Sequence, residues 1–217
     1  MAIINSLKWR AAVRKFDTSK KVNAQDIETL LEAGNLTATS MGLQPFKIIV
    51  IQNEALQQEL VPLSYHQQQV GDASHLLVFA IETEIGKESI DQYIQRAMDI
   101  RNVPYSSLEG YHQSVSGYIS QMDEKTKKDW ATKQAYIALG TVMTAAAELH
   151  IDSCAMEGFD TQAYQEKLGL DKKNLLPVVI LPIGYRSDED TNSKLPKVRK
   201  NRDEFVIEMI EPTSVSL

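Results

Sequence analysis

The positive charge of this chain gathers near its two ends. Eleven of the 23 lysine and arginine residues lie within residues 1–21 and 194–202, although the formal net charge is −6. They are Lys8, Arg10, Arg14, Lys15, Lys20, Lys21, Lys194, Lys197, Arg199, Lys200 and Arg202. Arginine and lysine together suit a phosphate, so the pattern is consistent with a small-anion site. Such charges also commonly form a solvated surface, and the pattern alone leaves both interpretations open.

The segment Cys154-Ala-Met-Glu-Gly-Phe-Asp160 could also carry chemistry. A short strand running into Glu157 and Gly158 would present backbone N–H groups at a turn, where glycine permits a ligand to approach closely. The segment is equally consistent with a simple strand-to-helix turn in which Asp160 caps the next helix. Both interpretations can hold together.

Other familiar catalytic patterns are missing from the sequence. The four histidines share no ligand spacing and the chain has one cysteine, so we expect no metal site. No glycine-rich phosphate loop and no nucleophile elbow occurs. Cys154 lies in an apolar neighbourhood, where we expect a buried strand residue rather than a nucleophile. Any redox chemistry would therefore have to come from a bound cofactor.

The composition narrows the class of protein. With 217 residues, 43% of them hydrophobic and 24% charged, the chain is expected to fold as one domain over residues 1–217. Its net negative charge disfavours nucleic acid or an anionic membrane as the main partner. The single cysteine and the lack of a signal-peptide core at the N-terminus predict a cytoplasmic protein. The uncharged run from Gln134 to Ala147 is too short to span a bilayer.

Hydrophobic periodicity predicts the elements that would position these segments. Residues 25–35 have the spacing of an amphipathic helix. Strands are predicted at 46–51, 75–81 and 176–182, and the continuous apolar run of the last indicates burial on both faces. Residues 87–121 look helical or mobile.

The helix predicted over residues 125–149 is the most informative element. A helix that is apolar nearly all round is buried, and this one carries no charge from Gln134 to Ala147. It can be the centre of the core or the middle of a dimer interface, which resembles a core cut in half. The tail Phe205-Val-Ile-Glu-Met-Ile210 could form a final strand, with no necessary neighbour in its own subunit.

Four segments, in order along the chain, resemble the nitroreductase family of FMN-dependent enzymes that use NAD(P)H. Arg10-Ala-Ala-Val-Arg-Lys-Phe-Asp17 is similar to the family's Arg-x-Ser-x-Arg/Lys-x-Phe opening. Thr37-Ala-Thr-Ser-Met-Gly-Leu-Gln-Pro-Phe46 is similar to its Pro-Ser-Ser-x-Asn-x-Gln-Pro-Trp loop. Ala155-Met-Glu-Gly-Phe159 resembles Pro-Ile-Glu-Gly-Phe, and Leu195-Pro-Lys-Val-Arg199 resembles the closing Leu-Pro-Lys-x-Arg. The segment from Trp130 to Gly140 also resembles the family's long central helix, so the match covers essentially the whole chain.

The resemblance implies a fold and an assembly. The fold would be α+β, with a central mixed β-sheet wrapped by helices. Two chains would form an intertwined homodimer in which the C-terminal strand of each is added to the partner's sheet. Each dimer would hold two FMN molecules at its interface.

The resemblance also implies which residues bind FMN. Arg10, Lys197 and Arg199 would grip the phosphate and ribityl end, and Arg14 would lie by the N1/O2 edge of the ring, where positive charge stabilises the reduced flavin. The N–H groups near Glu157 and Gly158 would face flavin N5. The other cofactor-binding positions are Ala11, Ala12, Ala155 and Met156, with His66 and Gln69 as polar flavin or nicotinamide contacts, and Thr39, Ser40, Gly42 and Gln44 from the partner chain.

The implied activity is hydride transfer from NAD(P)H through flavin N5 to small acceptors such as nitroaromatics or quinones, in a ping-pong sequence. The alternatives are another flavin reaction, such as enone reduction, dehalogenation or flavin destruction, a flavin-binding redox sensor, or a structural dimer without cofactor. Four positions depart from the family pattern, which leaves acceptor preference and flavin potential open. They are Ala12 for Ser, Gly42 for Asn, Phe46 for Trp and Ala155 for Pro.

Overall fold

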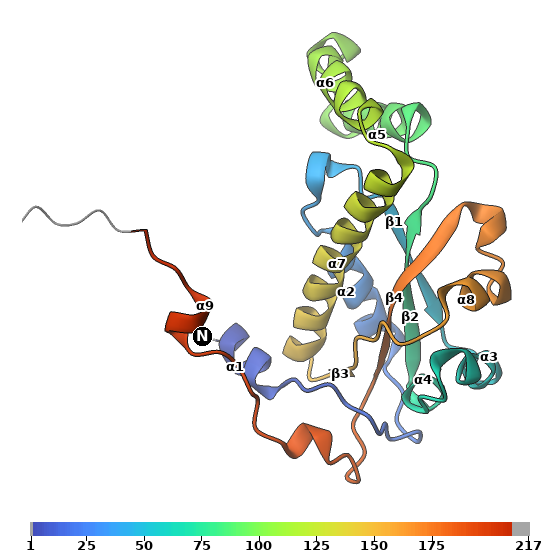
Figure 1. The fold of residues 1–217 in the computed structure, drawn as a ribbon, viewed down its shortest axis with the longest axis vertical. Coiled ribbons are helices and arrows are strands. Elements are labelled where there is room, and N and C mark those ends of the chain that lie inside the picture. The colour runs from blue at the N-terminus through green and yellow to red at the C-terminus, as the bar shows by residue number, and fades with distance from the viewer. Residues whose placement is uncertain (1, 210–217) are drawn as a thin grey trace, which may run out of the picture.

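The computed structural model describes residues 2–209, in which four strands form one sheet with helices on both faces (Figure 1). The strands are β1 (Phe46–Ile51), β2 (His75–Glu82), β3 (Asp152–Ser153) and β4 (Leu175–Gly184), in the order β1-β2-β4-β3. The three longer strands were predicted, and the α+β class is confirmed. Neighbouring strands are antiparallel. Parallel pairing in the described part is limited to an isolated bridge between Ala12 and Ser153.

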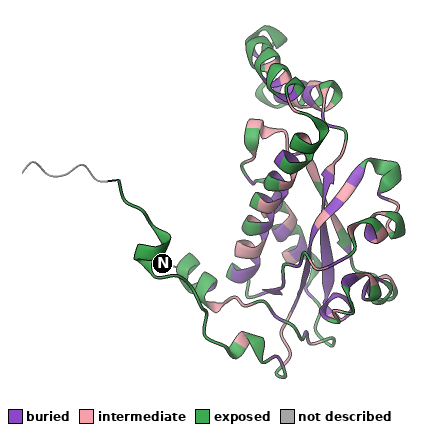
Figure 2. Cartoon of the chain, viewed as in Figure 1, coloured by how far each residue is buried: buried purple, intermediate pink, exposed green. Residues whose placement is uncertain are grey.

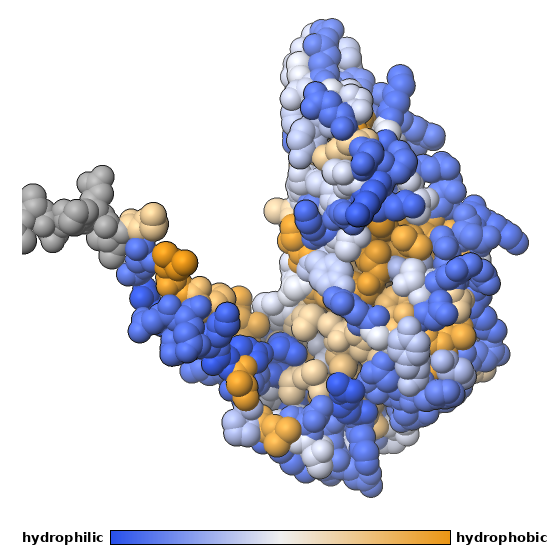
Figure 3. Space-filling model, viewed as in Figure 1, coloured by the Kyte–Doolittle hydropathy of each residue, from blue (hydrophilic) through white to orange (hydrophobic). Residues whose placement is uncertain are grey.

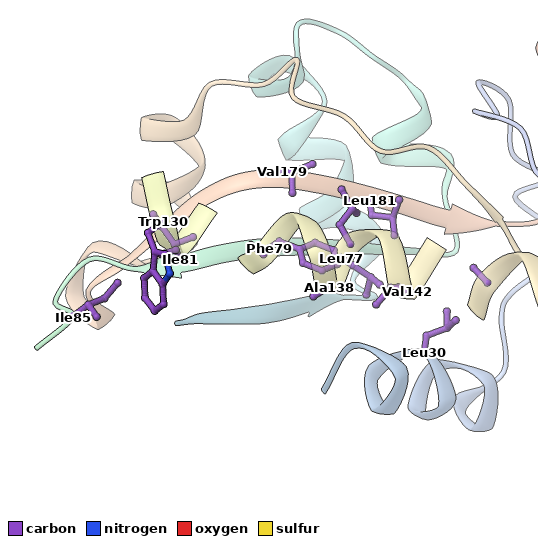
Figure 4. Packing of buried hydrophobic residues seen from close by; sticks show 14 of the residues in the cluster. Leu30, Leu77, Phe79, Ile81, Ile85, Trp130, Ala138, Val142, Val179 and Leu181 are labelled. Carbon is purple, nitrogen blue, oxygen red and sulfur yellow. The ribbon is translucent and has the colours of Figure 1, made fainter. Parts of the chain in front are cut away.

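The continuous apolar runs of β2 and β4 reflect burial on both faces of the sheet. In β2, Leu77, Phe79 and Ile81 point into one hydrophobic cluster (Figure 4). Leu76 and Val78 belong to another cluster. Successive side chains in a strand point to opposite faces, so a strand covered on both faces needs an apolar residue at every position.

Two helices cover the first face of the sheet, namely α2 (Ala24–Asn35) and α7 (Glu124–Glu148). Both were predicted to within one residue at either end. Their first turns are capped by Asn23 and Asp123, whose side chains accept from backbone N–H groups. Buried alanines of α7, such as Ala135 and Ala138, allow it to lie close to the sheet, and Figure 4 shows Ala138.

The second face is covered by α3 (Glu54–Leu60), α4 (Gln69–Asp72) and α8 (Thr161–Lys167). Asp160 caps α8, as the sequence predicted, because its carboxylate accepts from the N–H of Ala163 at 3.0 Å. Residues 87–121 are helical, which settles the choice that the sequence left open. They form α5 (Lys87–Arg101) and α6 (Glu109–Ser120), which project beyond one end of the sheet (Figure 1).

The two ends of the described chain form an arm that leaves the body of the fold (Figures 1 and 2). It contains α1 (Ala2–Trp9) and α9 (Arg202–Phe205) and is exposed over most of its length. Because α1 ends at Trp9, Arg10 and Arg14 do not share a helical face. The predicted strand at 205–210 is absent from residues 205–209: Phe205 closes α9 instead, and Ile210 lies outside the described residues. A strand needs a neighbouring edge to pair with, and this arm offers none.

Helix α7 has a buried face and an exposed face. Its exposed strip carries Ile137 and Gly140, and in the space-filling view the surface over α7 is orange to pale between bluer margins (Figure 3). The uncharged run of α7 therefore supplies the core on one side and leaves a weakly polar strip uncovered on the other. Within residues 2–209, no helix has both the length and the apolar character that a membrane crossing requires.

Candidate functional site

Three basic residues from the two chain ends, Arg10, Lys197 and Arg199, lie near one another, close to where Trp9 meets His150 just beyond α7. Burial lowers the pKa of Arg10, and so does the positive charge of Arg199 nearby. The pKa of Lys197, which is an exposed residue, is also lowered, first by partial desolvation and then by the positive charges of Arg10, Arg199 and Arg186. Arg10 and Lys197 therefore lie close enough to each other and to Arg199 for the like charges to act on both pKa values.

Arg10 also has an unused hydrogen-bond donor. Its Nε–H is buried, and no acceptor for it lies within residues 2–209. A buried guanidinium N–H without a partner is costly, and it is satisfied by an anion with several acceptor oxygens. Arg10, Lys197 and Arg199 therefore fit a phosphate group, and we call these three residues the basic cluster.

An ion pair between Arg186 and the buried Asp152 holds the arm beside the basic cluster, and we call this pair with Trp9 the brace. The guanidinium of Arg186 donates from Nε to both carboxylate oxygens of Asp152, at 2.9 and 3.0 Å, and stacks on the ring of Trp9 at 4.5 Å. Trp9 in turn meets the ring of His150 edge-on, with centroids 5.0 Å apart. Because Trp9 precedes Arg10, this brace fixes where Arg10 leaves α1.

Asp190 joins the two basic segments of the chain. Its buried carboxylate accepts from the N–H groups of Arg14 at 2.8 Å, Lys15 at 3.0 Å and Ser193 at 2.7 Å. Burial alone would raise the pKa of Asp190, but these donors outweigh it and hold the pKa below its usual value. The side chain of Arg14 is exposed, as is Ala12, whereas Ala11 is half-buried.

Cys154 lies under this region. It is buried, as predicted, but it follows β3 rather than lying within it. Burial raises the pKa of its thiol, although Arg14 and Arg10 act in the opposite direction. A buried thiol with a raised pKa is a poor nucleophile.

The turn at Glu157 and Gly158 is held from two sides. Tyr136 of α7 donates to Oε1 of Glu157 at 2.6 Å, and the amide of Gln67 donates to the carbonyl of Gly158 at 2.8 Å. The N–H groups of Glu157 and Gly158 have no acceptor within the described residues. Ala155 is exposed, whereas Met156 is buried and pairs with Ile180 of β4. The turn therefore offers two backbone donors to a ligand.

The two polar residues predicted near this turn, His66 and Gln69, lie in different environments. His66 is exposed, whereas Gln69 is buried and directs its amide at Gln67. Sequence reasoning missed Gln67 and Tyr136, which make the direct contacts. Gln67 lies between His66 and Gln69, so the segment was identified although the contacting side chain was not.

The loop that carries Thr39, Ser40, Gly42 and Gln44 packs against the middle of α7. Ser40 N–H donates to Gln134 Oε1 at 2.8 Å. Gly42 has a φ of +69°, and a Cβ there would lie 2.9 Å from the ring of Tyr93. A larger residue at position 42 would therefore be strained and would clash with Tyr93. From Gln134 to the end of α7 is about 20 Å at 1.5 Å per residue. One chain therefore does not bring this loop to the basic cluster.

Comparisons with known proteins agree with this architecture. Residues 7–185 match the model of the Nitroreductase family. A relative from Staphylococcus haemolyticus, whose name is that of an NAD(P)H nitroreductase, is 36% identical over 94% of this chain and 95% of its own. A nitroreductase-like protein from Streptococcus mutans has a TM-score of 0.84 at 21% identity, covering 96% of this chain and 98% of its own. A nitroreductase from Exiguobacterium sibiricum, solved with FMN, has a TM-score of 0.83 at 22% identity, covering 95% and 96%. This chain belongs to the nitroreductase family.

Proposed function

We propose that the protein is an FMN-dependent oxidoreductase that uses NAD(P)H to reduce small acceptors such as nitroaromatics or quinones. The observation that carries this proposal is the basic cluster with its unpartnered Arg10 Nε–H, which suits the single terminal phosphate of FMN. Bound FMN would supply the hydride chemistry, accepting hydride from the nicotinamide and passing it to the acceptor in a ping-pong sequence.

Different residues of the chain would bind and orient different parts of FMN. Arg10, Lys197 and Arg199 hold the phosphate end. Arg14 brings its charge to the pyrimidine edge of the ring, where it stabilises the negative charge of the reduced form. The segment from Ala155 to Gly158 directs its free N–H groups at the ring, and the exposed His66 remains available to the nicotinamide.

We propose that two chains form the site together. The partner's loop, with its Thr39, Ser40, Gly42 and Gln44, would reach the flavin that the basic cluster holds. Support comes from the exposed strip of α7 and from apolar side chains that stay uncovered on the arm, such as Leu7, Leu195 and Val198. Apolar surface that a second chain would cover is typical of an interface between subunits.

Gly140→Arg is expected to convert the dimer into a monomer and to abolish FMN binding. Gly140 is exposed on α7, and a Cβ there would meet no atom within 4 Å, so arginine fits the single chain but not a second α7 packed against it. The measurement is size-exclusion chromatography with light scattering. Ala55→Arg, on an exposed position of α3, is the matched control and should remain dimeric. A Gly140→Arg dimer with normal flavin content would overturn the interface model.

The activity itself is tested by colour. The purified protein, loaded with FMN, should be yellow, should bleach when NADPH or NADH is added without oxygen, and should recover its colour when a nitroaromatic or a quinone is added. Flavin released by denaturation should be FMN rather than FAD. A protein that binds no flavin after reconstitution, or that stays yellow with both nicotinamides, would refute the proposed function.

We place this activity in the cytoplasm as part of the proposal. The support is the single cysteine, Cys154, which is buried as a free thiol. Proteins without disulfides are typical of reducing compartments, where NAD(P)H is also available.

A further inference from the structure

We infer that Gln67 is a positioning residue that fixes the Gly158 peptide group and, through it, the two backbone donors that the turn presents to a ligand. The inference rests on the proposed function, because it assigns the free N–H groups of Glu157 and Gly158 to the bound flavin ring.

The amide of Gln67 has little freedom. Its Nε2 donates to the carbonyls of Gly158 at 2.8 Å and Ser64 at 3.1 Å, so both of its N–H donors are used. Its Oε1 accepts from the amide of Gln69 at 3.2 Å, and the Gln69 side chain is buried. A carboxamide with both donors and its oxygen engaged is fixed in one orientation.

The backbone in front of Gln67 is held in an unfavourable conformation. Tyr65 and His66 are consecutive residues with φ of 52° and 58°, in the left-handed region that residues with a Cβ avoid. Ser64 anchors this stretch, since its buried hydroxyl donates to the carbonyl of Leu60 at 2.9 Å and lies 2.7 Å from the hydroxyl of Tyr164. Backbone strain that surrounding contacts maintain is characteristic of functional segments. Here the strained residues Tyr65 and His66 place Gln67 against the turn at Gly158.

Two further contacts fix the turn, one from α7 and one from the segment that carries Gln67. Tyr136 donates to Glu157 Oε1, and the N–H of Asp160 donates to the carbonyl of Leu63 at 2.8 Å. A Cβ on residue 158 would lie 2.9 Å from Gln67 Nε2, so glycine is what lets the amide approach. The contacts hold the side chain of Glu157, the carbonyl of Gly158 and the N–H of Asp160. The N–H groups of Glu157 and Gly158 are left for the ligand.

The test replaces Gln67 by leucine, which has similar bulk and no hydrogen-bonding groups. In the flavin-free protein, the amides of Phe159 and Asp160 should exchange with deuterium at least ten times faster, because the peptide group that joins Gly158 to Phe159 loses the hydrogen bond that anchors its carbonyl. In the FMN-loaded protein, the affinity for oxidised FMN should fall about tenfold while the affinity for reduced FMN changes little. The two-electron potential should then rise by about 30 mV. The oxidised ring is more sensitive because its N5 accepts a hydrogen bond, whereas the reduced N5 carries a hydrogen.

Gln68→Leu is the matched control, since Gln68 is an exposed neighbour whose side chain, within residues 2–209, bonds to Gln58 and Asp72 and not to the turn. It should match the wild type in both measurements. Gln67→Met has a similar length, carries no charge and loses the Nε2 donors, and it should reproduce the leucine result if the latter variant folds poorly.

Each outcome has one meaning. Unchanged exchange and unchanged potential in a folded Gln67 variant would overturn the inference. Faster exchange with an unchanged potential would also overturn it, because the turn would then not act on the ring. If the wild type binds no flavin, the proposed function fails. In that case the inference falls with it, even if the exchange data still report how Gln67 holds the turn.

Discussion

Arg10→Ala is expected to weaken the binding of FMN by about 100-fold and to leave the binding of riboflavin, which lacks the phosphate, unchanged. The loss corresponds to about 3 kcal/mol, the range of charge-assisted hydrogen bonds to a phosphate. The variant should fold normally without flavin, because it removes a buried cation that Arg199 repels. The measurement is the quenching of flavin fluorescence as flavin-free protein is added.

The matched control for this variant is Arg96→Ala. Arg96 is exposed on α5 and its loss changes the net charge by the same amount, so FMN affinity should stay at the wild-type value. Added salt should weaken FMN binding more in the wild type than in Arg10→Ala. Equal losses for FMN and riboflavin would mean that Arg10 acts on the fold, and no loss for either would place the phosphate elsewhere.

Asp152→Asn is expected to lower the free energy of unfolding by about 3 kcal/mol, because it leaves the Arg186 guanidinium partly buried without its counter-charge. Asp152 is 3% exposed and accepts from the backbone N–H of Arg186 at 2.8 Å as well as from its side chain. The variant should also weaken FMN binding, since the brace on Trp9 positions Arg10. Urea denaturation of the flavin-free protein measures the first effect, and fluorescence titration measures the second.

Glu189→Gln supplies the control for the buried pair. Glu189 pairs with Lys15 at 3.1 Å, and its side chain is 77% exposed, so its replacement should change stability too little to resolve. If Asp152→Asn unfolds at the same urea concentration as the wild type, the brace is not what holds the arm to the sheet.

The sequence by itself determined the elements whose signals are local. The apolar runs at 46–51, 75–81 and 176–182 predicted β1, β2 and β4, because a strand covered on both faces must be apolar at every position. The uncharged run of α7 and the cap at Asp160 were likewise evident from neighbouring residues. Clustered basic residues indicated an anion site, and four ordered motifs indicated the family.

Only the tertiary structure decided which of these residues meet. Asp190 joins Arg14 across 176 positions and Gln67 joins Gly158 across 91, and no local pattern encodes such hydrogen bonds. Helix α1 ends at Trp9, and Arg186 stacks on the ring of that residue. This contact fixes the position from which Arg10 follows the helix. The tail at 205–209 had strand character, but a strand forms only where another edge accepts its hydrogen bonds, and one chain offers none there. The periodicity of a sequence indicates which residues of an element face the core. Which distant residue each of them contacts is decided by the packing of the whole chain.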